Sequence, residues 1–179
     1  GKLLVERALS SGDTSYALDV ARRYHSRFPA NDIVGLTFVK ALVAAAHYAE
    51  ADSALARVDV LPQEGASDVH ALYRETKLML AVDAMAAGRW KDASTLVAAA
   101  REWPERLGEG KPYEADVDER LEDWLLASIL ERSGRREEAA RIRTRLRDWS
   151  SSRLTGVEVR VLSAWRRRVG SLATSPADE

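Results

Sequence analysis

Apolar residues recur along this chain at spacings of three and four, which is the period of an amphipathic helix. Valines stand among alanines and leucines at this spacing, and no stretch alternates apolar and polar residues as a half-buried strand does. The pattern therefore predicts an all-α protein. The predicted helices cover residues 2–11, 14–28, 32–46, 48–60, 67–87, 90–103, 117–133, 136–149 and 155–172.

Four corners between these helices share one short pattern, a small residue followed five positions later by alanine. Glycine suits the first position because a residue that ends a helix in the left-handed conformation costs glycine little. Alanine suits the second because a larger side chain would push the paired helix away. The spacing predicts four tight corners, each joining two antiparallel helices. The pairs are Gly12/Ala17, Ala46/Ala51, Gly88/Ala93 and Gly134/Ala139.

Prolines mark the predicted ends of the second helix in the first three pairs. Pro29, Pro62 and Pro104 each follow the alanine of a corner. Proline lacks a backbone N–H and clashes with the preceding turn, so a helix seldom continues through it. Each second helix is therefore expected to extend close to its proline.

Together these features resemble the tetratricopeptide repeat family, whose unit is a helix–turn–helix of roughly 34 residues ending in proline. The step from Ala17 to Ala51 matches that period, and the longer later steps indicate inserts at 62–67 and 104–116. The resemblance covers roughly residues 2–150 and implies a right-handed α-α superhelix, a solenoid of about four helix pairs. It implies one domain over residues 1–173, with units at 2–31, 32–65, 66–116 and 117–151, a capping helix at 155–172 and a disordered tail at 174–179.

The second insert carries a weaker resemblance. EWPERLGEGKP (102–112) is similar to the YPENLG-x-G-K/R-P stretch of helical repeats attached to some bacterial predicted carbohydrate-active proteins of unknown function. Trp103 replaces the tyrosine and Arg106 the asparagine. The resemblance implies a bacterial accessory region, and a start without methionine predicts a fragment of a longer protein.

The composition of the chain excludes several classes of protein. The chain of 179 residues has 46% hydrophobic and 31% charged residues, as soluble globular proteins do, and no apolar run of membrane-spanning length. We therefore expect a soluble protein with no membrane partner, and favour the cytoplasm. Absent cysteine rules out disulfides and thiol catalysis. The net charge is −1, but residues 1–119 carry 14 Lys/Arg against 19 Asp/Glu, whereas residues 120–179 carry 13 against 9.

Few residues are spaced as in a catalytic or ligand-binding site, so the sequence predicts neither an enzyme nor a cofactor. GEGK at 108–111 lacks the spacing, the preceding strand and the following Ser or Thr of a phosphate loop. The acidic residues between Glu114 and Asp123 lack the glycine of a calcium-binding loop, and they suit the first turn of a helix. His25, His47 and His70 are scattered, so no metal site is predicted.

The arginines of residues 136–147 form a basic stripe that could contact nucleic acid. Arg136, Arg143 and Arg147 lie together away from the apolar face of the predicted helix. Glu137 and Glu138 are spaced to pair with Arg141. A solvated helix face explains this pattern better, so no nucleic-acid partner is predicted.

The functional prediction rests on the first helix of each pair, which lines the concave surface in the family that this chain resembles. The resulting groove is largely apolar and suits an amphipathic helix. We predict a non-catalytic scaffold that binds a protein segment; the alternative is an accessory region that packs on a neighbouring domain of its own protein. The candidate groove residues are Leu36, Lys40, Leu78, Val82, Met85, Trp124, Ser128, Glu131 and Arg132.

Overall fold

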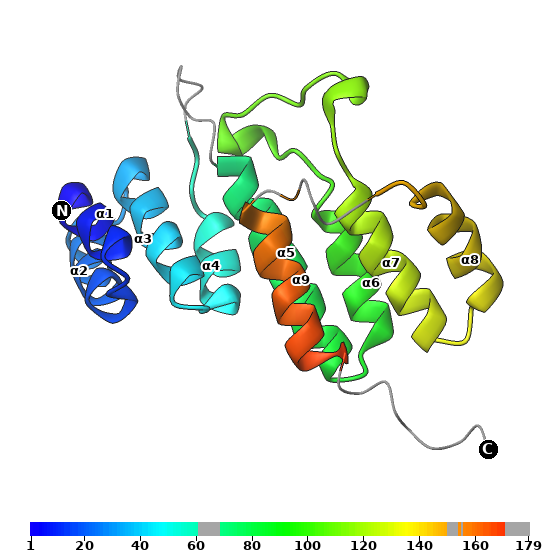
Figure 1. Ribbon diagram of the computed structural model, residues 1–179. Helices are drawn as coiled ribbons and strands as arrows, with labels where there is room; N and C mark the ends of the chain where they lie inside the picture. The colour runs from blue at the N-terminus through cyan, green and yellow to red at the C-terminus, as the bar shows by residue number, and fades with distance from the viewer. Residues whose placement is uncertain (61–68, 150–153, 155, 171–179) are drawn as a thin grey trace. The chain divides into compact units, whose positions relative to one another are not determined.

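The computed structural model describes residues 1–60, 69–149, 154 and 156–170, and within these ranges the chain forms helices and no strand (Figure 1). The prediction of an all-α protein is confirmed. The α-helices are α1 (Lys2–Ser10), α2 (Thr14–Arg27), α3 (Asp32–Ala44), α4 (Tyr48–Leu55), α5 (Val69–Ala86), α6 (Trp90–Ala99), α7 (Arg120–Arg132), α8 (Arg136–Arg145) and α9 (Gly156–Arg168); the 3₁₀ turns are η1 (Glu105–Leu107) and η2 (Glu114–Asp116).

The four predicted corners close with the same pair of backbone hydrogen bonds. At the first corner the N–H of Gly12 donates to the carbonyl of Leu9 (3.1 Å), and the N–H of Asp13 donates to that of Ala8 (2.9 Å). This is the Schellman arrangement, which needs a left-handed residue just after the helix. Gly12 has that conformation (φ 81°). The same bonds and a positive φ recur at Ala46, Gly88 and Gly134.

The alanine that follows each corner is fully buried. Ala17, Ala51, Ala93 and Ala139 expose none of their surface. In each case the alanine N–H donates to the carbonyl of the residue just after the corner residue, so it lies in the first turn of the second helix. Each corner thus places a small side chain in a fully buried position, as the sequence pattern predicts.

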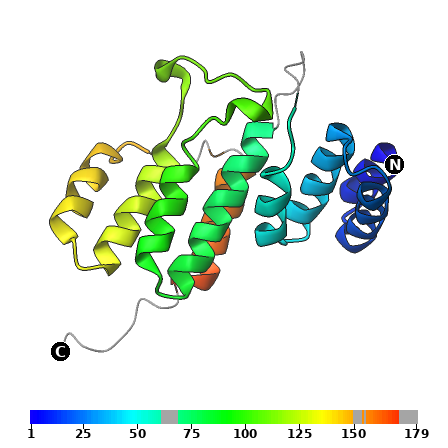
Figure 2. The same cartoon turned by 180° about the vertical axis from the view of Figure 1, so that it is seen from behind.

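The helices fall into two compact units. Unit 1 comprises residues 1–76 and 103–111, and unit 2 comprises residues 77–102 and the chain from 112 onward. In unit 1, α1 packs on α2 and α3, α2 packs on α3, and α3 packs on α4. In unit 2, α6 packs on α7 and α7 on α8, in the order that Figure 2 shows from behind. A single domain over residues 1–173 stays a prediction.

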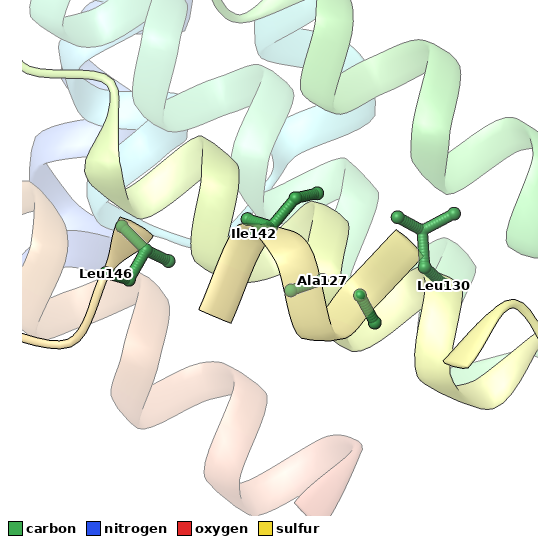
Figure 3. Packing of buried hydrophobic residues seen from close by; sticks show 5 residues of the cluster. Ala127, Leu130, Ile142 and Leu146 are labelled. Atoms are coloured by element: carbon green, nitrogen blue, oxygen red, sulfur yellow. The ribbon is translucent and has the colours of Figure 1, made fainter. Parts of the chain in front are cut away.

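The core between α7 and α8 has the composition that the helical period predicts. Ala127 and Leu130 of α7 meet Ile142 of α8 and Leu146 just after it, together with the corner alanine Ala139 (Figure 3). Each side of the cluster contributes one alanine and at least one larger aliphatic residue. The cluster holds the last helix pair together, and Trp124, Leu126 and Trp149 pack against its edge.

Helices α4, α6 and α8 end four or five residues earlier than predicted, and α9 ends at Arg168, before the predicted residue 172. The predicted ends are residues 60, 103 and 149, whereas α4 ends at Leu55, α6 at Ala99 and α8 at Arg145. For α4 and α6 the signal that failed was proline, since only α2 extends close to its proline. Beyond α4 the chain turns at residues 56–57, and the N–H of Val60 donates to the carbonyl of Arg106 (2.7 Å). Pro62 and the predicted insert at 62–67 lie outside the described residues.

The second insert is held against unit 1 and is not a free loop. The Arg106 guanidinium donates to the carbonyl of Leu55 and to that of Val58 (3.3 Å). Leu55 is the last residue of α4, so Arg106 satisfies a carbonyl that the helix itself leaves unpaired. Leu107 next to it is buried.

His70 near the start of α5 contacts Trp103, which precedes this insert, and Glu109, which lies within it. Trp103 stacks on its ring, with 3.3 Å between ring centroids and 6° between planes. Glu109 accepts a hydrogen bond from its backbone N–H (2.8 Å). Trp103, Arg106 and Glu109 therefore attach this stretch to the rest of unit 1.

Candidate functional site

Helix α7 carries four of the predicted groove residues. Trp124, Ser128 and Arg132 follow one another at a spacing of four, and Glu131 lies beside them, so they share one side of the helix. Ser128 is buried, Trp124 and Arg132 are half-buried, and Glu131 is exposed.

Arg143 of α8 joins three of these side chains. Its Nε donates to Glu131 Oε1 (3.0 Å), and its Nη2 donates to Glu131 Oε2 (3.1 Å) and to Ser128 Oγ (3.0 Å). Its guanidinium lies 5.0 Å from the centre of the Trp124 ring, within cation–π range. A bidentate pair holds the planar fork in one orientation. Arg143, the central arginine of the predicted basic stripe, therefore already binds side chains of its own protein.

Helix α9 lies against α7 through aromatic and cationic contacts. The Trp165 ring meets the Trp124 ring edge to face, with centroids 4.7 Å apart and planes at 80°. The Arg132 guanidinium lies 5.8 Å from the Trp165 ring and donates a hydrogen bond to the carbonyl of Val169 (3.2 Å). Two of the predicted groove residues therefore hold α9.

The same helix also contacts α5. The guanidinium of Arg168 forms a salt bridge with Asp83, and α9 runs alongside α5 in Figure 1. Val161, Leu162 and Ala164 of α9 are buried. The sequence predicts a helix that caps the open end beyond the last pair; these contacts instead place α9 against α5 and α7. Residues 155, 171 and 172 of that predicted helix, and the tail at 174–179, lie outside the described residues.

The apolar part of the predicted groove is closed. Leu78, Val82 and Met85 of α5 expose none of their surface. Their interpretation as an open lining is therefore wrong for this structure, in which they belong to the core of unit 2. The physical reason is that exposed apolar surface is unfavourable in water, so these side chains are covered in the folded chain.

Leu36 and Lys40 of α3 belong to unit 1. Both side chains are half-buried. They lie beside fully buried residues of the same helix, such as Val39 and Leu42. A groove that continues from these residues to those of unit 2 stays a prediction.

A pocket of about 310 Å³ opens where α7, α8 and α9 meet. Trp124, Trp149 and Leu162 contribute apolar walls, and Arg143 and Arg166 contribute positive charge. Sequence reasoning names Trp124 but misses the pocket, because its walls come from residues up to 42 positions apart that are united only by the docking of α9.

A second pocket, of about 460 Å³, lies in unit 1 between α2, α3 and α4. At its edge Arg22 donates to both carboxylate oxygens of Glu50 (3.0 and 2.8 Å). His25 stacks on Phe38 with 4.8 Å between ring centroids. Arg22 and Glu50 therefore neutralise each other at this edge, whereas the buried Nδ1 of His25 has no hydrogen-bond partner among the described residues.

The acidic residues before and within α7 have partners of their own. Arg101, after α6, donates to Glu119 (2.5 Å) and to Asp123 (2.8 Å). Burial lowers the pKa of Arg101, but the hydrogen bonds with Asp123 and Glu119 outweigh that effect, so its pKa is raised. Asp118 pairs with Arg120. Over the ranges that the structure describes, no group of three or more His, Asp or Glu side chains could hold a metal ion.

The expected pairing of Glu138 is wrong in detail. The sequence predicts Arg141 as its partner, whereas the structure pairs it with Arg135, both of whose contacts with the carboxylate are 2.6 Å. This hydrogen bonding and the charge of Arg135 lower the pKa of Glu138. Arg136 and Arg147 of the predicted stripe are exposed.

Comparison of the chain with protein-family models, with curated proteins and with solved structures gives no match. A bilayer would need a longer and more apolar helix than any found in the described part of the chain.

Proposed function

We propose that this protein is a non-catalytic helical scaffold that binds an amphipathic helix of a partner on the face of α5 and α7. The proposed architecture is a right-handed solenoid of tetratricopeptide-like pairs. Its support is the common backbone geometry of the four corners, including the buried alanine five residues after each left-handed residue.

The single observation that carries the proposal is the docking of α9. An amphipathic helix of 13 residues lies on this face, with one aromatic contact (Trp165 with Trp124) and two polar anchors (Arg132 with the Val169 carbonyl, Arg168 with Asp83). Helix-in-groove recognition uses the same elements, an apolar face inserted between helices and a few oriented polar contacts. A partner helix of this pattern would compete with α9 for the face.

A partner helix in solution must compete with α9, which is part of the same chain as the face it covers. A helix linked to its own site has an effective concentration in the millimolar range, so a partner in solution must bind much more tightly to displace it. Variants that weaken α9 should therefore bind an added helix more strongly. This relationship supplies the test.

The experiment measures binding of a labelled peptide with the sequence of residues 156–170 to the full chain by fluorescence anisotropy. The receptors are the unchanged chain and the double variant Trp165→Ala/Arg168→Glu, whose own α9 has lost two anchors. We expect the double variant to bind the peptide at least about tenfold more tightly, which corresponds to about 1.4 kcal/mol. A peptide of identical composition in scrambled order is the control.

The proposal fails if neither receptor distinguishes the native peptide from the scrambled one while circular dichroism shows both receptors folded. The accessory-region alternative has support of the same kind, since α9 shows an intramolecular segment on this face. A carbohydrate-active context for the whole protein stays a prediction from the WPERLG stretch.

A further inference from the structure

We infer that the pocket between α7, α8 and α9 binds a bulky apolar side chain of an acidic protein segment. This inference rests on the proposed scaffold function and names the chemistry of a partner for a second place on unit 2. The pocket is open, whereas the face of α5 that α9 covers is closed.

The size and walls of the pocket suit one side chain. Its volume of about 310 Å³ lies at the lower end of the roughly 300–1,000 Å³ range of ligand pockets. Trp124 and Trp149 are half-buried, so each presents part of an indole ring. Aromatic walls bind an aliphatic or aromatic side chain through a large apolar contact at small cost in side-chain entropy. Trp124 is held in place by Trp165 on one side and by Arg143 on another, so this wall is preorganised.

The positive charge of the pocket favours a partner segment in which an acidic residue lies next to that apolar side chain. Arg143 and Arg166 line the pocket, and no acidic residue lines it. Arg143 is engaged with Glu131, while Arg166 is exposed and has no acidic partner within the ranges that the structure describes. A carboxylate of the partner would supply the missing counter-charge for Arg166. The surrounding residues 120–179 have a net charge of +4, which also favours an acidic segment.

Nucleic acid is the competing class of anion, and the contacts favour protein. Binding of a nucleic-acid strand draws on several arginines or lysines that contact successive phosphates. Here Arg135 and Arg143 already hold carboxylates through two hydrogen bonds each. Of the two arginines that line the pocket, only Arg166 holds no carboxylate of the described part of the chain, and one such guanidinium beside two indole rings matches a single carboxylate next to an apolar side chain.

The experiment uses the full chain and a fluorescein-labelled pentapeptide, Glu-Asp-Phe-Glu-Asp, with binding followed by anisotropy at low and at physiological salt. One control peptide replaces phenylalanine by glycine and another replaces the acidic residues by lysine. The protein variants are Arg166→Glu and, as a matched control with the same change of charge on the same helix, Arg167→Glu. Arg167 is exposed and does not line the pocket.

The inference expects binding of the acidic phenylalanine peptide, at least tenfold weaker binding of either control peptide, and loss of about tenfold in affinity with Arg166→Glu. Arg167→Glu should retain affinity within about threefold, since it lies outside the pocket. Equal effects of the two protein variants would overturn the inference, because they would indicate general charge attraction. So would absence of binding, or tighter binding of a labelled single-stranded oligonucleotide that the peptide does not displace.

Failure here is distinguishable from failure of the proposed function. The peptide of residues 156–170 reports on the face of α5 and α7, whereas the acidic pentapeptide reports on the pocket. Binding of the first without the second would leave the scaffold function standing and remove only the acidic partner.

Discussion

The indole of Trp165 on α9 meets the indole of Trp124 on α7 edge to face, with 4.7 Å between ring centroids. The two residues are 41 positions apart in the chain, and their contact unites the C-terminal helix with the predicted groove. Because Arg132 also lies over the Trp165 ring, this one side chain receives both an aromatic and a cationic contact.

Replacing Trp165 by alanine should release α9. The change removes the contact with Trp124 and the cation–π contact with Arg132, and we expect a loss of about 2–4 kcal/mol in the free energy of unfolding, the lower part of the range reflecting partial exposure. Hydrogen–deuterium exchange should rise in residues 156–170. Arg167→Ala, an exposed change on the same helix, serves as the control. Unchanged exchange in α9 would show that its other contacts are sufficient to hold it.

Replacing Ala46 by glycine should stabilise the protein. Ala46 is the only non-glycine residue with a positive φ (60°) in the part of the chain that the structure describes. Glycine relieves the steric cost of that conformation, although it adds entropy to the unfolded chain, so we expect a net gain of about 0.5–1 kcal/mol. Thermal unfolding measures it.

The reciprocal change Gly88→Ala tests the same argument in the opposite direction. Gly88 has φ 70° in an equivalent corner, and a Cβ there would meet no atom within 4 Å. Any loss of stability must then come from backbone strain and not from a clash. We expect a loss of about 1 kcal/mol. Stabilisation by Gly88→Ala would contradict the assigned corner geometry.

Arg101→Met should destabilise unit 2 by about 1–2 kcal/mol. The arginine bridges Glu119 and Asp123 from a position where about a quarter of its side chain is exposed, so solvent screens part of the interaction. The effect should shrink as salt increases. The matched control is Arg89→Met, which breaks an exposed pair with Asp92 and should cost less than about 0.5 kcal/mol. Equal losses in chemical denaturation would refute a special role for Arg101.

The carboxyl group of Glu138 should titrate below its ordinary value of 4.5, because Arg135 lowers its pKa. A lowered pKa in the folded state means that the pair contributes to stability above the ordinary value. That contribution is lost as the pH falls through the lowered value. Side-chain carbon NMR of Glu138 measures the midpoint, which should rise in Arg135→Gln. An identical midpoint in both proteins would show that the pair does not form in solution.

Sequence reasoning predicts the local features of this fold well. A corner depends on residues within one short segment, so Gly12 and Ala17 are enough to indicate its position and its close packing. The helix ends after Leu55 and Ala99 were harder to predict. They depend on contacts with distant residues, such as that of Arg106 with a carbonyl 51 positions earlier.

In the candidate site, too, the features that depend on one helix are predictable and those that depend on distant contacts are not. Helical spacing correctly groups Trp124, Ser128 and Glu131 on one side of α7, since that is a property of one helix. It does not predict that Leu78 and its neighbours would be covered, because burial depends on contacts with other parts of the chain and not on one helix alone. Whether a partner uses the remaining residues stays a prediction.

The division of the chain into units has a consequence for the order of synthesis. Unit 1 takes in residues 103–111, and Arg106 holds the end of α4 from there. A ribosome that has released residues 1–76 has therefore not yet released all of unit 1. Residues 77–102, which belong to unit 2, emerge before the first unit is complete. The contact of Arg106 with the end of α4 can therefore form only after α6 has been made, so unit 1 is completed after the synthesis of unit 2 has begun.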